Sequence, residues 1–170
     1  MAGPANKQGR IIADNICGGD SRYLGSQGSS VIKVFDMTAA TTGINETNAK
    51  KSGLEVDTVI LSPMSHAGYY PGGKVMTMKV VFEKETYRLL GAQIIGYEGV
   101  DKRIDVLATA IHAGLKATQL KDLDLAYAPP YSSAKDPVNM AGFMIDNIAK
   151  GTLKQWHLEL SLIHISEPTR

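Results

Sequence analysis

Two short segments of this 170-residue sequence carry tyrosines in settings suited to hydrogen-bond chemistry. Tyr69 and Tyr70 lie in the glycine-rich run His-Ala-Gly-Tyr-Tyr-Pro-Gly-Gly, and Tyr127 and Tyr131 bracket a stiff Pro-Pro pair. A phenol donates a hydrogen bond at low cost in side-chain entropy, so rigid loops that display phenols make good binding sites. The same rings could instead plug the rim of a hydrophobic core, and the residues alone leave both interpretations open.

The other residues with chemical potential stand alone. His66 and His112 lack metal-ligand spacing, and we expect each to be a surface or packing histidine. Cys17, the single cysteine, is expected to be a structural thiol, because a reactive thiol needs an accessible, electropositive setting. The sequence has no complete dinucleotide fingerprint, Walker loop or nucleophile elbow. No metal site is predicted.

Composition excludes several classes of protein. Eighteen basic and 17 acidic residues give a net charge of +1, which argues against a nucleic-acid binder or a polybasic membrane module. No apolar run approaches the roughly 20 residues that span a bilayer, and the first residues do not resemble a signal peptide. A single cysteine suits a reducing compartment. We therefore expect one globular, cytoplasmic domain with no nucleic-acid or membrane partner.

The elements that would position these residues follow from the apolar pattern. Segments rich in β-branched and apolar residues predict strands at 29–40, 56–61, 74–82 and 88–97, with a turn at 41–43. Helices are predicted from Pro4 to Ile16, after Asn45, after Asp101 and after Asp136. Strands occupy the middle of the chain and helices its ends, without β-α-β alternation. This order predicts an α+β domain with helices packed on an antiparallel sheet.

The last residues, 160–170, match the in-frame translation of a transposon-type sequencing-library adapter. We treat them as read-through and leave them out of the fold prediction. The gene model would then be truncated at its 3′ side. A genuine short tail is the alternative.

Six motifs in a fixed order carry a family resemblance. They are residues 3–10, 33–36, 42–46, 66–72, 99–106 and 127–132. Together they resemble the C-terminal part of the FAD-dependent pyridine nucleotide-disulfide oxidoreductases, in the branch of the coenzyme A disulfide reductases, NADH oxidases, peroxidases and persulfide reductases. The resemblance covers the chain from Ala2 to about His157.

The resemblance implies a division of the chain. Residues 1–28 would be a helix and linker left from the end of the FAD-binding domain, and 29–151 the dimerisation domain. Residues 152–159 resemble a linker that leads to a rhodanese domain, and we favour that fused form. Residues 160–170 are the adapter segment.

The resemblance also implies roles for particular residues. Tyr69 and Tyr127 would act in trans as catalytic residues, approaching the reactive cysteine of the partner in a homodimer. Pro4, Ala5 and Asn6 would lie at the fringe of the flavin site.

Two basic residues could meet the substrate. Lys102 and Arg103 would contact phosphates of coenzyme A, although structural pairing with Asp101 and Asp105 is the favoured interpretation.

The implied parent protein is an enzyme that passes a hydride from NAD(P)H through FAD to a disulfide, either a coenzyme A disulfide or a persulfide. Both dinucleotide folds and the reactive cysteine would lie upstream, and Cys17 does not fall at that cysteine's position. We therefore expect this chain alone to bind no cofactor and to be inactive. The alternatives are a fragment of an NADH oxidase or peroxidase and a freestanding, non-catalytic dimerisation module.

Overall fold

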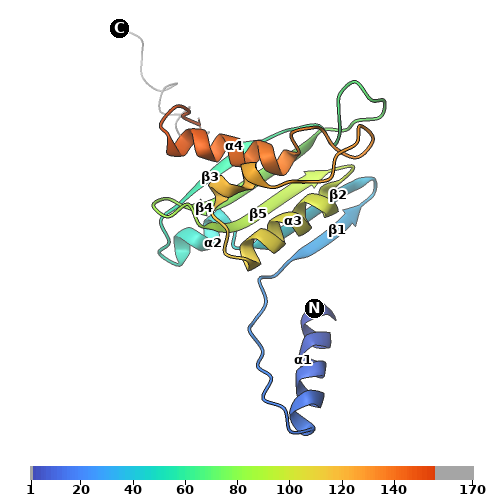
Figure 1. Ribbon diagram of the computed structural model, residues 1–170, viewed down its shortest axis with the longest axis vertical. Coiled ribbons are helices and arrows are strands. Elements are labelled where there is room, and N and C mark those ends of the chain that lie inside the picture. The colour runs from blue at the N-terminus through green and yellow to red at the C-terminus, as the bar shows by residue number, and fades with distance from the viewer. Residues whose placement is uncertain (1, 156–170) are drawn as a thin grey trace.

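The computed structural model describes residues 2–155 of the chain (Figure 1). Its elements, in chain order, are α1 (Ala2–Ile16), β1 (Ser30–Val34), β2 (Met37–Gly43), α2 (Glu46–Lys51), β3 (Val56–Leu61), β4 (Met76–Glu83), β5 (Leu89–Gly96), α3 (Val100–His112), the 3₁₀ helix η1 (Ala117–Asp122) and α4 (Pro137–Ala149). The adapter segment 160–170 and residues 156–159 of the expected linker lie outside the described residues.

A five-stranded sheet forms the centre of the domain. Its strands run in the order β1-β2-β5-β4-β3, and each neighbouring pair is antiparallel. The helices α3 and α4 lie across one face of this sheet (Figure 1). The predicted α+β fold, with helices on an antiparallel sheet, is confirmed. The antiparallel strands β4 and β5 form a hairpin whose connection is residues 84–88.

The core lies between the sheet and these helices. Successive residues of a strand point to opposite faces, so every second residue of β4 faces the helices. Met76, Met78 and Val80 on β4 are fully buried there, as are Leu107 on α3 and Ile145 on α4. Burial of each such side chain contributes about 1.5–3 kcal/mol. This layer fixes the ends of the strands and helices from which the loops emerge.

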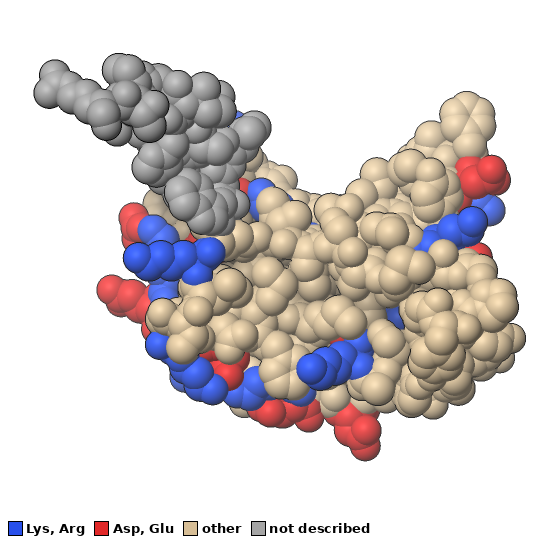
Figure 2. All heavy atoms as spheres, turned by 90° about the horizontal axis from the view of Figure 1, so that it is seen from above, with Lys and Arg blue, Asp and Glu red and all other residues tan. Residues whose placement is uncertain are grey.

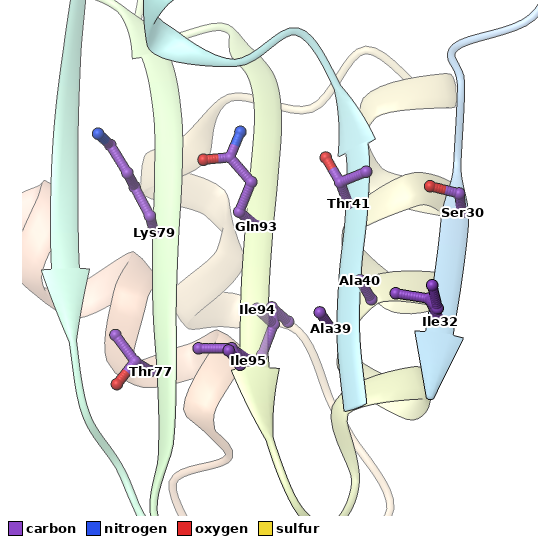
Figure 3. Close-up of a pocket in the computed structure, with 10 residues that line it drawn as sticks. All are labelled: Ser30, Ile32, Ala39, Ala40, Thr41, Thr77, Lys79, Gln93, Ile94 and Ile95. Carbon is purple, nitrogen blue, oxygen red and sulfur yellow. The ribbon is translucent and has the colours of Figure 1, made fainter. Parts of the chain in front are cut away.

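The other face of the sheet is largely uncovered. A shallow cavity of about 370 Å³ runs across β1, β2, β5 and β4, and its floor combines Ala39 and Ile95 with the polar Thr41, Gln93 and Lys79 (Figure 3). The short helix α2 covers only one end of this face, where Ala49 is buried.

The predicted first helix is present and stands apart from the sheet. α1 buries no residue and is joined to β1 by an extended segment (Figure 1).

The predicted strand at 29–40 is wrong in one respect, because the chain reverses at Phe35 and Asp36 and forms the two strands β1 and β2. Phe35 adopts a φ of 52°, which a tight hairpin requires. The predicted turn at 41–43 is therefore the end of β2.

The start of α3 also differs from the prediction. Asp101 lies in the first turn of the helix, and the N-cap is Gly99, with a left-handed φ of 68°. Asp136 does cap α4, since its side chain accepts a hydrogen bond from the Val138 N–H and Pro137 occupies the first turn.

Candidate functional site

The structure brings Tyr69 and Tyr127 together although they are 58 residues apart in the chain. Their hydroxyl oxygens are 2.6 Å from each other, a hydrogen bond in which one phenol donates to the other. Tyr69 lies in the loop between β3 and β4, and Tyr127 lies in the loop between η1 and α4. Both rings are open to solvent, with exposed fractions of 74% and 46%.

The two tyrosine-bearing loops lie side by side at one end of the sheet (Figure 1). Each is closed by a tight turn, in which the Tyr70 N–H donates to the Ala67 carbonyl and the Tyr131 N–H to the Ala128 carbonyl. A direct link joins them, because the Ala67 N–H donates to the Ser132 carbonyl at 2.9 Å. The two loops that carry the phenols are therefore held to each other by a backbone hydrogen bond as well as by the contact between the phenols.

Figure 2 shows the molecule from above. Charged side chains of both signs lie mainly toward its rim, and a broad area between them carries few charges.

His66 takes the packing role that was expected. It is buried, and its ring meets the edge of the Tyr70 ring with the two centroids 5.6 Å apart. Its Nδ1 lies 3.1 Å from the Ala67 carbonyl oxygen. His66 thus packs within the glycine-rich run, of which it is the first residue.

Arg103 is directed into the protein, where its guanidinium pairs with Asp136. Arg103 Nη2 is 3.0 Å from an oxygen of the Asp136 carboxylate, and both side chains are almost completely buried. The partner is therefore Asp136, not Asp101 or Asp105. Lys102 lies nearer the surface, with its Nζ 3.9 Å from the same carboxylate and a hydrogen bond to the Ala126 carbonyl.

Two pKa shifts describe the electrostatics of the site. Burial raises the pKa of Asp136, but hydrogen bonds from Ser132 and the Val138 N–H, together with the Arg103 guanidinium, outweigh it and hold the pKa below its usual value. The hydrogen bond with Tyr69 raises the pKa of Tyr127. Asp136 is therefore ionised at neutral pH, and the phenol of Tyr127 is protonated.

The sequence predicted Asp136 only as a helix cap, and it did not indicate that Ser132 would bind the Asp136 carboxylate. Ser132 is fully buried, and its hydroxyl donates to the Asp136 carboxylate at 2.6 Å. The signal was a serine followed four residues later by an aspartate beside a tyrosine loop, a pattern too common to be interpreted without the fold.

The residues predicted at the flavin fringe form no cradle here. Pro4, Ala5 and Asn6 lie in the first turns of α1, which buries none of its residues, and the Asn6 side chain donates back to the Ala2 carbonyl. They line neither the cavity across the sheet nor the one bordered by Gln27 and Asn48. On their own, these exposed residues do not enclose a surface on which a flavin could be held.

Two further features bear on the sequence predictions. Cys17 is exposed just beyond α1, and five strands, two α-helices and η1 separate it in sequence from the Tyr127 loop. Within residues 2–155 no cluster of three metal-ligating side chains occurs, and no helix there is long and apolar enough to cross a membrane.

Comparison with known proteins gives consistent matches. Residues 29–138 match the family described as pyridine nucleotide-disulphide oxidoreductase, dimerisation domain. A coenzyme A disulfide reductase of Staphylococcus epidermidis is 38% identical over 144 residues, which cover 84% of this chain and 32% of that protein. The chain thus spans about a third of the length of the curated relatives it matches.

Two solved structures share both fold and sequence with the chain. The reduced Bacillus anthracis protein CoADR-RHD is 49% identical with a TM-score of 0.90, over 98% of this chain and 30% of that one. An NAD-dependent persulfide reductase from A. fulgidus is 46% identical with a TM-score of 0.87, over 91% of this chain and 29% of that one.

Proposed function

Because this chain belongs to the pyridine nucleotide-disulphide oxidoreductases and carries their dimerisation domain, we propose that it presents Tyr69 and Tyr127 to the active site of a second copy. The parent protein would be a homodimeric flavoenzyme that reduces coenzyme A disulfide or a persulfide. The observation that supports this most is the 2.6 Å contact between two exposed phenols on adjoining loops.

The phenol pair suits the exchange of sulfur bonds. Two hydroxyls carry two protons, of which one is used in their mutual hydrogen bond, so one O–H can be donated outward. When a thiolate attacks a disulfide, negative charge develops on the leaving sulfur, and a donor placed beside it lowers the cost of that charge. The raised pKa of Tyr127 keeps its proton in place for this role.

The sulfur would come from the other subunit. Cys17 is the only cysteine of the sequence, and α1, which precedes it, lies at the opposite end of the molecule from the tyrosine loops (Figure 1). The pair therefore faces outward without a reactive sulfur from the described residues. The reactive cysteine would lie in the part of the parent protein that precedes this chain, and we propose that the second subunit's copy meets the pair.

The remaining assignments are part of the same proposal. FAD and NAD(P)H would bind domains that precede this chain, and residues 1–28 would continue the flavin domain, with Pro4, Ala5 and Asn6 at its fringe. Residues 29–151 would form the dimerisation domain and 152–159 a linker towards a rhodanese domain, in a cytoplasmic enzyme. Lys102, which is partly exposed beside the Tyr127 loop, would be the basic residue that meets a coenzyme A phosphate.

A mixed dimer of the full-length protein tests the arrangement. One subunit carries Tyr69→Phe with Tyr127→Phe, and the other has serine in place of its reactive cysteine. Each homodimer should lose activity towards coenzyme A disulfide, the tyrosine variant by about 10²-fold as for the loss of a positioned donor. The mixed dimer should recover about half of the normal rate, because one of its two sites then combines an intact cysteine with intact tyrosines.

Tyr131→Phe is the matched control. Tyr131 belongs to the same loop and is 72% exposed, so its loss should leave the rate nearly unchanged. If the mixed dimer stays inactive, the tyrosines do not act across subunits. A full-length protein that oxidises NADH with oxygen and ignores disulfides would favour the oxidase alternative.

A further inference from the structure

Arg103 is the largest fully buried side chain of the described residues, with 1% of its surface exposed. A buried cation is unfavourable unless it is both paired and hydrogen-bonded. Asp136 supplies the pairing, since Arg103 Nε and Nη2 both donate to its carboxylate at 3.0–3.4 Å. The guanidinium has further N–H groups, and these also need hydrogen-bond acceptors in the protein interior.

Those donors reach both tyrosine-bearing loops. Nη2 donates to the Ser65 carbonyl at 2.8 Å and to the Tyr131 carbonyl at 3.3 Å. Ser65 precedes Tyr69 by four residues, and Tyr131 follows Tyr127 by four. One planar group therefore connects the backbone of the two loops, four residues along the chain from each phenol.

The start of α3 is built to admit this group. Arg103 Nη1 donates to the Gly99 carbonyl at 3.2 Å, and a Cβ atom on Gly99 would lie only 2.0 Å from that nitrogen. Gly99 thus leaves the space that the guanidinium occupies.

The phenol rings cannot hold themselves in place. Tyr69 is 74% exposed and Tyr127 46%, so packing around the Tyr69 ring in particular contributes little to its orientation. Their contact depends on how the two loops are held, and the hydrogen bonds of the loops converge on Arg103, Ser132 and Asp136.

We infer that Arg103 is a positioning residue, whose guanidinium holds the two loops in the arrangement that brings the hydroxyls of Tyr69 and Tyr127 together. Lysine could keep the charge beside Asp136, but its single ammonium lacks the planar fork that reaches a carboxylate and two carbonyls at once. The catalytic meaning of this role rests on the function proposed above. The geometry itself can be tested in the 170-residue chain without a partner.

The test is Arg103→Lys in the full chain labelled with ¹³C at the tyrosine Cζ atoms. The resonances of Tyr69 and Tyr127 are assigned with Tyr69→Phe and Tyr127→Phe, and the titration of Tyr127 is followed by NMR. In the parent chain Tyr127 should titrate above ordinary tyrosine. In Arg103→Lys its midpoint should fall to that of the Tyr69→Phe chain, because the mutual hydrogen bond is lost.

Leu107→Ala serves as control, since Leu107 is buried one turn further along α3 and makes none of these polar contacts. It should lower stability and leave the Tyr127 midpoint unchanged. An unchanged midpoint in a folded Arg103→Lys chain would overturn the inference.

If Arg103→Lys does not fold, Ser132→Ala decides the question. It removes one hydroxyl from the network and retains the pairing of Arg103 with Asp136, and it should shift the Tyr127 midpoint part of the way. No shift at all would again overturn the inference. The mixed-dimer experiment can fail while this shift is still observed, so the two proposals are separable.

Discussion

Replacement of Asp136 by alanine should be among the most destabilising single changes in the domain. The carboxylate accepts hydrogen bonds from Arg103 at 3.0 Å, from the Ser132 hydroxyl at 2.6 Å and from the Val138 N–H at 3.0 Å. Alanine removes all of these and leaves the Arg103 guanidinium buried without its counter-ion.

The expected cost follows from these contacts. Removal of one partner from a buried ion pair costs about 3–5 kcal/mol, and loss of a helix N-cap costs about 1 kcal/mol. Both losses concern one carboxylate and do not simply add, so we expect a total near 4 kcal/mol, with an uncertainty of about 1. Because domains are stable by only about 5–15 kcal/mol, Asp136→Ala would remove a large share of the stability.

Urea denaturation of the 170-residue chain, followed by circular dichroism, measures the effect. With a slope of about 2 kcal/mol per molar urea, the midpoint should fall by about 2 M. Asp146→Ala is the control, because Asp146 lies on the same helix and pairs with Lys121 and Lys150 near the surface. Water can replace those partners, so the shift should be far smaller. Equal shifts for the two variants, or a shift below about 0.5 M for Asp136→Ala, would refute the reasoning.

Three other predictions follow from the structure. Two lysines that hydrogen-bond to Glu46 lower its pKa from 4.5 to about 2, so the stability that this group contributes is complete above pH 4.5 and is lost as the pH falls towards 2. Asp136, whose pKa is also lowered, adds to the same loss of stability in acid. Urea midpoints measured between pH 2 and 6 should therefore fall with pH, and a flat profile would contradict this prediction. Gly91→Ala should cost about 3 kcal/mol in thermal or urea unfolding, because a Cβ there would lie 2.0 Å from the Ile44 carbonyl oxygen, whereas Gly9→Ala, with no atom within 4 Å, should be neutral or slightly stabilising. The purified chain should retain no flavin absorbance and consume no NADH, and detection of either would show that the cofactor sites do not lie in other domains.

The regular parts of the fold were predictable because they follow from local patterns. The alternation along β4 marks a strand with one buried face, and Asp136 followed by Pro137 marks the start of α4. The hairpin at Phe35 and Asp36 was hidden, since Phe35 is not a usual turn residue, no glycine or asparagine stands beside Asp36, and apolar residues continue on both sides. The left-handed backbone conformation of Phe35 is offset by the hydrogen bonds between β1 and β2 on either side of it.

The site was only half predictable. The resemblance singled out Tyr69 and Tyr127, but their contact depends on two loops that meet only after the sheet and α4 are in place. The charged run at the start of α3 suggested pairs between neighbours in sequence. Arg103 instead pairs with Asp136, 33 residues away, because the side chain at that position of the helix faces inward and needs a buried counter-ion.

The exposure of β1 has a consequence for the separate domain in solution. β1 closes one edge of the sheet, and all five of its residues are exposed, including Val31, Ile32 and Val34. The outer backbone groups of an edge strand form a template on which a strand from another molecule can align, and charged side chains are the usual protection against this. Lys33 is the only charge in β1. We therefore expect separate domains to associate at this edge as their concentration rises.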